Sequence, residues 1–172
     1  MRSSGTYVRR APDLGTVTDA PLSSWHIGEG IRNAERFFRV LPQVFPDATL
    51  FIAEGSSISN EVGAFYRRHA PRDPTRPADL SALTLAPRYL CACTPEFFLE
   101  LARLAAKTPR DHILHHLYLY SGARQLIYWH DAFANDLILS PELPEATVAA
   151  LAKKFGVRHR RGRLAGPSPE CP

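Results

Sequence analysis

The sequence contains no apolar run long enough to cross a membrane, since no stretch approaches the roughly 18 apolar residues of a transmembrane helix. Its start, "MRSSGTYVRRAPDLG", also lacks the apolar core of a secretory signal peptide. These two absences predict a soluble, cytoplasmic protein that has no membrane as a partner.

Cysteine is scarce as well: three residues are too few, and odd in number, for a disulfide framework. Cys171 is the penultimate residue. Cys91 and Cys93, in "YLCACTPEFF", would share one face of a strand, where a CxC pair can bind a soft metal. No second Cys/His pair stands nearby in the sequence to complete four ligands, so we expect both thiols to pack in the core.

The usual nucleotide and nucleophile motifs are missing from "FIAEGSSISNE", which matches neither GxxxxGK[ST], GxGxxG nor GxSxG. A strand that ends at Glu54 before a helix is nevertheless a common ligand position in α/β proteins. One hypothesis is therefore a small hydrolase or phosphate/nucleotide-binding enzyme. Glu54 would be its acid–base group, and the amides of Gly55, Ser56 and Ser57 would hold an anion. The simpler interpretation is helix capping by Ser57 or Ser59.

The net charge of +4 comes from the two ends of the chain. Residues 1–23 contribute +1 and residues 158–172 contribute +3, which leaves 24–157 neutral. We expect one globular domain over 24–157, a weakly ordered extension before it and a mobile basic tail after it. Nucleic-acid binding through Arg158–Arg163 is an alternative function. It is not the favoured one, because a domain that grips phosphates usually carries the basic face on its fold.

The composition, 45% hydrophobic and 22% charged, is typical of a globular protein. Apolar spacing predicts helices at 28–42, 58–70, 94–108 and 144–157, the first of which should stop at Pro42. Strands are predicted at 48–55, 88–94, 112–120, 124–133 and 135–140. The order α-β-α-β-α-β-β-β-α predicts a single-domain α/β fold, bordering on α+β. Its mixed sheet would have about five strands, and helices would cover at least one face.

Four of the seven histidines lie in "DHILHHLYLYSGARQLIYWHDAF", which predicts a β-hairpin around a glycine-containing turn. If the turn centres on Gly122–Ala123, His115 faces His130 across the strands. If it centres on Ser121–Gly122, His115 faces Tyr128 instead. The first register offers a possible metal site, since a pair of imidazoles with a nearby carboxylate suits zinc.

Strand alternation places a second set of side chains on the other face of this hairpin. The set consists of His112, His116, Tyr118, Tyr120, Trp129 and Asp131. Such amphipathic rings occur either on a half-buried sheet face or on a surface that a partner covers. We therefore expect a non-enzymatic protein that binds another protein and needs no cofactor or metal; the sequence leaves its oligomeric state open. In size and lack of a catalytic motif it resembles small bacterial interaction proteins, such as adaptors and immunity proteins, a resemblance that assigns no residue.

Overall fold

The computed structural model describes residues 23–28, 30–72 and 86–163. The segments 1–22 and 164–172, which belong to the predicted extension and tail, lie outside these residues. Within the described part the strands are β1 (Ser23–Ile27), β2 (Leu50–Glu54), β3 (Arg88–Ala92), β4 (His116–Ser121), β5 (Arg124–Trp129), β6 (Leu137–Leu139) and β7 (His159–Arg163). The helices are α1 (Ala34–Val44), α2 (Asn60–Arg68), α3 (Pro95–Ala105), the short 3-10 helix η1 (Arg110–His112) and α4 (Glu145–Phe155).

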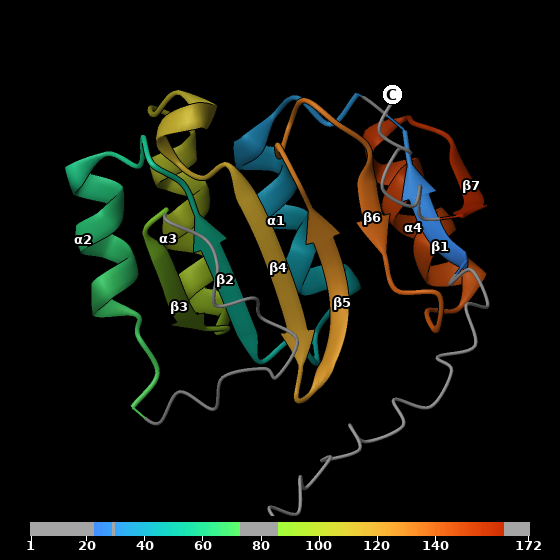
Figure 1. Ribbon diagram of the computed structural model, residues 1–172, viewed down its shortest axis with the longest axis horizontal. Helices are drawn as coiled ribbons and strands as arrows, with labels where there is room; N and C mark the ends of the chain where they lie inside the picture. The colour runs from blue at the N-terminus through green and yellow to red at the C-terminus, as the bar shows by residue number, and fades with distance from the viewer. Residues whose placement is uncertain (1–22, 29, 73–85, 164–172) are drawn as a thin grey trace, which may run out of the picture.

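The described strands form one seven-stranded sheet in the order β3-β2-β4-β5-β6-β1-β7 (Figure 1). Every pairing in it is antiparallel. The α/β fold was predicted correctly in its coarse form, but the prediction of about five strands with parallel parts was wrong. After α2 the chain returns to the end of the sheet where β2 finishes, so that Arg88 pairs with Glu54. A parallel β-α-β unit would instead begin its next strand at the opposite end.

The two strands that were not predicted, β1 and β7, pair with each other over Ser23–Ile27 and His159–Arg163. The sequence of β7, "HRRGR", has no apolar alternation, and its residues were assigned to the mobile tail. Main-chain hydrogen bonds to β1 hold it in the sheet, and these do not depend on side-chain pattern. Arg161 adds a contact of its own, since its guanidinium lies 4.6 Å from the centre of the Trp25 ring.

The helix ends follow local chemistry in most cases. The Thr94 side chain accepts a hydrogen bond from the Phe97 amide, as predicted for the start of α3. Gly156, with φ of 69°, ends α4 in the left-handed conformation. The predicted stop at Pro42 was wrong, because α1 continues to Val44. A proline in the last turn removes only one backbone hydrogen bond, and the buried face of the helix offsets that loss.

Helices α1, α3 and α4 lie on one face of the sheet, and α2 lies beside β3 at its edge (Figure 1). The main core fills the space between these two layers. Its centre is built from aromatic rings, with Phe37 packed on Trp129 and Phe51 packed on Phe97. Burial of rings of this size supplies a large share of the folding free energy.

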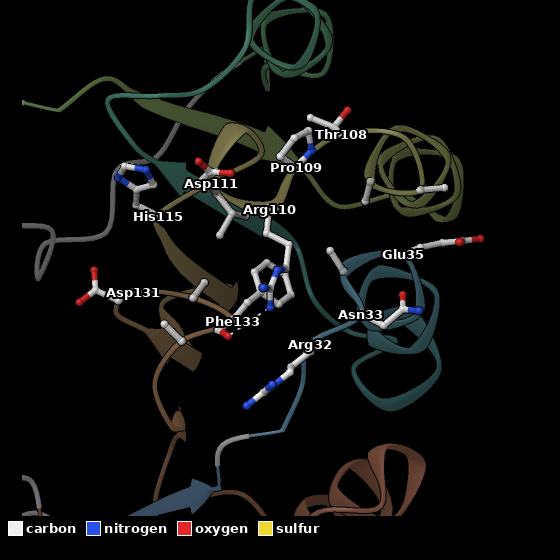
Figure 2. Close-up of a pocket in the computed structure, with 16 residues that line it drawn as sticks. Arg32, Asn33, Glu35, Thr108, Pro109, Arg110, Asp111, His115, Asp131 and Phe133 are labelled. Carbon is white, nitrogen blue, oxygen red and sulfur yellow. Dashed lines mark hydrogen bonds between the residues drawn. The ribbon is translucent and has the colours of Figure 1, made fainter.

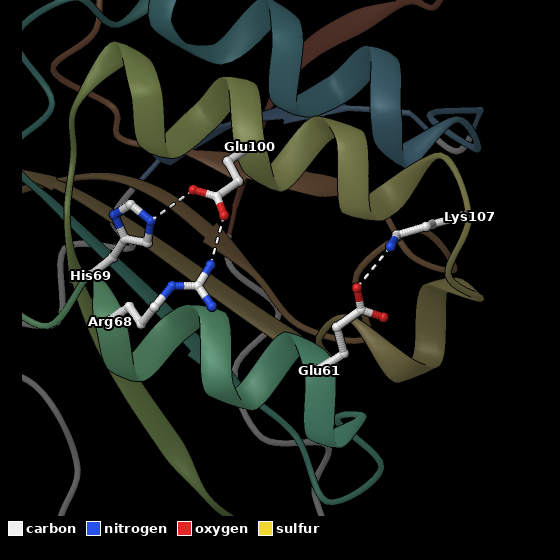
Figure 3. Close-up of polar contacts among 5 residues, drawn as sticks. All are labelled: Glu61, Arg68, His69, Glu100 and Lys107. Atoms are coloured by element: carbon white, nitrogen blue, oxygen red, sulfur yellow. Dashed lines mark hydrogen bonds and ion pairs between the residues drawn. The ribbon is translucent and has the colours of Figure 1, made fainter.

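Ion pairs tie α2 to α3 on the outer side of the helix layer (Figure 3). Arg68 lies 2.6 Å and His69 lies 3.2 Å from the two carboxylate oxygens of Glu100, and Lys107 lies 2.7 Å from Glu61. Most of these side chains are exposed, so each pair stabilises the fold by less than about 1 kcal/mol.

The opposite face of the sheet has no helix over it among the described residues (Figure 1). This helix-free face carries a second, smaller apolar cluster built from Leu50, Ile52 and Tyr120. It also presents the polar side chains that form the candidate site.

Candidate functional site

The predicted hairpin is present as β4 and β5, but both strands are shorter than the predicted 112–120 and 124–133. Residues 110–112 form η1, so the predicted binding residue His112 lies outside the sheet. The chain leaves β5 after Trp129 and turns. Because both strands are shorter than predicted, the side chains that come into contact differ from those that the sequence placed together.

Of the two turns left open by the sequence, the hairpin has the one centred on Gly122–Ala123, since Ser121 pairs with Arg124 beside it. Between Tyr120 and Leu119 a β-bulge shifts the register by one residue, so that Tyr118 pairs with Tyr128. The shift brings His130 next to His116 rather than His115, and the two rings stack with centroids 4.2 Å apart at 26°. The predicted His115–His130 pair is therefore not formed. Sequence spacing alone cannot show a bulge, because the extra residue obeys no pattern.

Asp131 lies in the turn after β5 with φ of 46°, a left-handed conformation that is unusual outside glycine. Its backbone amide donates a hydrogen bond of 3.1 Å to Nδ1 of His116. Its carboxylate Oδ2 lies 3.1 Å from Nδ1 of His130 and accepts a hydrogen bond from Asn135. Strand alternation predicted that the side chains of Asp131 and His130 would point to opposite faces of the sheet. That prediction was wrong, because the strand has already ended.

Deeper in the sheet, Glu54 is almost fully buried and forms an ion pair with Arg88 at 3.1 Å. The Tyr118 hydroxyl forms a hydrogen bond with the same carboxylate. Its ring stacks on that of Tyr128, with centroids 5.4 Å apart. We call the whole group the polar patch, and it consists of Glu54, Arg88, His116, Tyr118, Tyr128 and His130.

Three groups of the polar patch have shifted pKa values. Burial, followed by the nearby Glu54 charge, raises the pKa of Tyr118 to about 12. Burial, followed by the charges of Asp131 and Glu54, raises the pKa of Tyr128. Burial, followed by the neighbouring His130, lowers the pKa of His116. Clusters of residues with shifted pKa values are typical of functional sites, and ion-pair networks produce such shifts too. At neutral pH these three side chains are uncharged.

Two of the predicted binding residues are buried and do not reach the surface. Trp129 lies on the helix side of the sheet against Phe37 and Phe133, with 1% of its surface exposed. Tyr120 is also buried, and its hydroxyl accepts a hydrogen bond from Gln125. The predicted binding residues at the accessible part of this region are His116, Tyr118 and Asp131.

The loop after β2, predicted as an alternative catalytic site, has the features of a helix start. The Gly55 amide donates to the Pro87 carbonyl at 3.2 Å, so it does not point to a ligand. Ser59 caps α2 through its side-chain oxygen, while Ser56 and Ser57 are exposed. This geometry favours the capping interpretation.

The thiols of the CxC pair face the main core. Cys91 is fully buried, and its Sγ donates to the Tyr66 carbonyl. Burial raises the pKa of Cys91 and of Cys93 to about 12, so both stay protonated at neutral pH. A protonated thiol is a poor nucleophile and a poor metal ligand.

A pocket of about 860 Å³ lies beside the polar patch, between the start of α1, η1 and the turn after β5 (Figure 2). Figure 2 shows Arg110 near the centre of this pocket, where its Nη1 donates a hydrogen bond of 3.5 Å to the Phe133 carbonyl oxygen. Among the residues that line it, only His115 and Asp131 were singled out from the sequence. The sequence does not indicate that Arg32 and Arg110 line the same pocket, because they come from distant segments of the chain.

No helix among residues 23–28, 30–72 and 86–163 is long and apolar enough to cross a membrane. No protein-family model, curated protein or solved structure matches this chain.

Proposed function

We propose that this chain is a binding protein without catalytic chemistry of its own, and that a protein partner docks on the polar patch. The supporting observation is the placement of two stacked ring pairs, Tyr118–Tyr128 and His116–His130, side by side on the helix-free face. All four rings are partly exposed. Rings with an apolar body and a polar tip are enriched at protein interfaces.

The charge of the patch favours a polypeptide over a nucleic acid. Glu54 neutralises Arg88, and the two phenols are protonated. In the basic C-terminal segment, Arg160 is paired with Asp136 at 3.0 Å. A nucleic-acid partner requires an excess of cations facing its phosphates. We infer that the partner presents a largely uncharged surface, with carbonyl groups that accept from the Tyr128 hydroxyl.

Most of the patch also lies on rigid elements, since Glu54, His116, Tyr118 and Tyr128 belong to strands β2, β4 and β5. Strands β2, β4 and β5 are interior strands of the sheet, so their side chains are held in place before a partner arrives. A preordered surface loses less conformational entropy on binding than a loop does. The alternative enzyme at Glu54 has less support, because this carboxylate would have to leave Arg88 before it could act as a base.

Tyr128→Ala tests the proposal, because Tyr128 is partly exposed and its ring forms one of the two stacked pairs. Partners retained from an extract of the source cells by the full-length protein are identified by mass spectrometry, then purified and titrated. We expect Tyr128→Ala to weaken binding at least about tenfold, as for an interface hot spot.

Leu99→Ser is the matched control, since Leu99 is an exposed apolar residue on the helix layer. It should bind the partner as tightly as the unaltered chain. Equal affinity of the Tyr128 variant would contradict docking on the patch. Turnover of a small molecule, with no retained partner, would contradict the binding function itself.

A further inference from the structure

Three metal-binding side chains meet at the end of the hairpin. His116 lies at the start of β4, while His130 and Asp131 follow the end of β5. One ligand atom from each residue lies within 4.8 Å of the other two. Neither the bulge nor the left-handed turn that creates this meeting is visible in the sequence.

The hydrogen bond of His116 shows which of its nitrogens offers a lone pair. Nδ1 accepts from the Asp131 amide, so the neutral ring carries its proton on Nε2. The Nδ1 lone pair therefore points to the turn that holds the other two residues, where it accepts from the Asp131 amide. A cation bound there would replace a single hydrogen bond from a backbone amide.

The carboxylate of Asp131 is held in place on the same side. Its Oδ2 lies beside His130 and accepts from Asn135 at 3.4 Å, and its second oxygen adds further acceptor capacity. The side chains of His130 and Asp131 are 54% and 53% exposed. Solvent therefore reaches the cluster, and water can fill the remaining coordination positions of an ion.

We propose that His116, His130 and Asp131 bind a divalent transition-metal ion of the zinc type. Two imidazole nitrogens and one carboxylate oxygen suit such an ion, whereas calcium and magnesium require more oxygen ligands. Ligand atoms around tetrahedral zinc are about 3.4 Å apart, so closure requires shifts of about an ångström from exposed side chains. This site shares His116 and His130 with the proposed partner surface. The two proposals are tested separately, because zinc binding is measured without a partner and leaves Tyr128 unchanged.

Titration calorimetry with zinc chloride on the metal-free, full-length protein tests the site. We expect one ion per chain, with binding weakened at least tenfold in His130→Ala and in His116→Ala, and severalfold in Asp131→Asn. Cobalt(II) gives a second readout, since its visible absorption reports nitrogen coordination. Zinc should also raise the melting temperature of the unaltered chain and leave that of His130→Ala unchanged.

His112→Ala is the matched control. His112 is exposed and has a neighbouring carboxylate, Asp111, at 3.9 Å, but it lies outside the cluster. This variant should bind zinc as tightly as the unaltered chain. If His116→Ala does not fold, His130→Ala decides, because the hydrogen bond from the Asp131 amide to His116 does not involve the His130 ring. Absence of stoichiometric binding, or binding that persists in His130→Ala, would overturn the proposal.

Discussion

At the scale of single residues, Trp129 and His130 are chain neighbours in opposite environments. Trp129 is buried against two phenylalanine rings, and its Nε1 donates to the Asn135 carbonyl at 2.9 Å. More than half of His130 is exposed. We predict that Trp129→Ala lowers the free energy of unfolding by about 3–5 kcal/mol. His130→Ala should lower it by less than about 1 kcal/mol.

Urea unfolding in the presence of a chelator measures both values without any contribution from bound metal. The ordering is the informative part of this experiment. A His130 variant that unfolds at lower urea than the Trp129 variant would mean that the histidine pair, and not the aromatic core, holds the hairpin.

Tyr118 provides a prediction for alkaline pH. Its pKa is 10.0 ordinarily and about 12 in the folded protein, through burial and the Glu54 charge. The unfolded chain therefore releases this proton first. The contribution of Tyr118 to the free energy of unfolding is complete below about pH 10 and is lost as the pH rises through about 12.

The test compares the loss of stability of Tyr118→Phe and of the unaltered chain between about pH 9 and pH 11. Phenylalanine cannot ionise, so the variant should lose less stability over this interval, although it starts from a lower value without its hydrogen bond to Glu54. Equal losses would show that Tyr118 titrates alike in the folded and unfolded states.

At the scale of elements, β7 is the strand whose structure differs most from the structure predicted from its sequence. Deleting residues 158–172 removes the pairing partner of β1 and the guanidinium packed on Trp25. We predict that this deletion lowers stability by more than about 2 kcal/mol, equivalent to a melting temperature about 4–8 °C lower. A mobile tail could be deleted without this cost.

Deletion of residues 164–172 alone is the matched control for this truncation, because it leaves all of β7 in place. Circular dichroism melting of both truncated chains provides the comparison. The prediction fails if the longer deletion melts at the temperature of the shorter one.

The elements that were predicted well are those with strong local signals. Thr94 before a proline, Gly156 after an apolar stripe, and the glycine turn of the hairpin act within a few residues of themselves. The elements that were missed depend on distant partners. β1 lies between β6 and β7 in the sheet, and β7 pairs with β1, while a five-residue strand has little local signal of its own.

At the scale of the whole molecule, the helices gather on one side and the candidate site lies on the other (Figure 1). In the hairpin this separation follows from the strand sequence. In β4, for example, Leu117 and Leu119 face the main core, while His116 and Tyr118 face away. In this two-layer arrangement one sheet face carries the core, while the opposite face has no helix over it among the described residues.

By itself the sequence determined the α/β class, most of the helices and the hairpin, because these depend on the spacing of apolar side chains and on capping groups nearby. The antiparallel order of the strands, the burial of Trp129 and the meeting of His116 with His130 were decided only by tertiary structure. A one-residue bulge and one left-handed aspartate redirected the histidines. Such local irregularities are stabilised by long-range packing, and no periodic pattern in the chain encodes them.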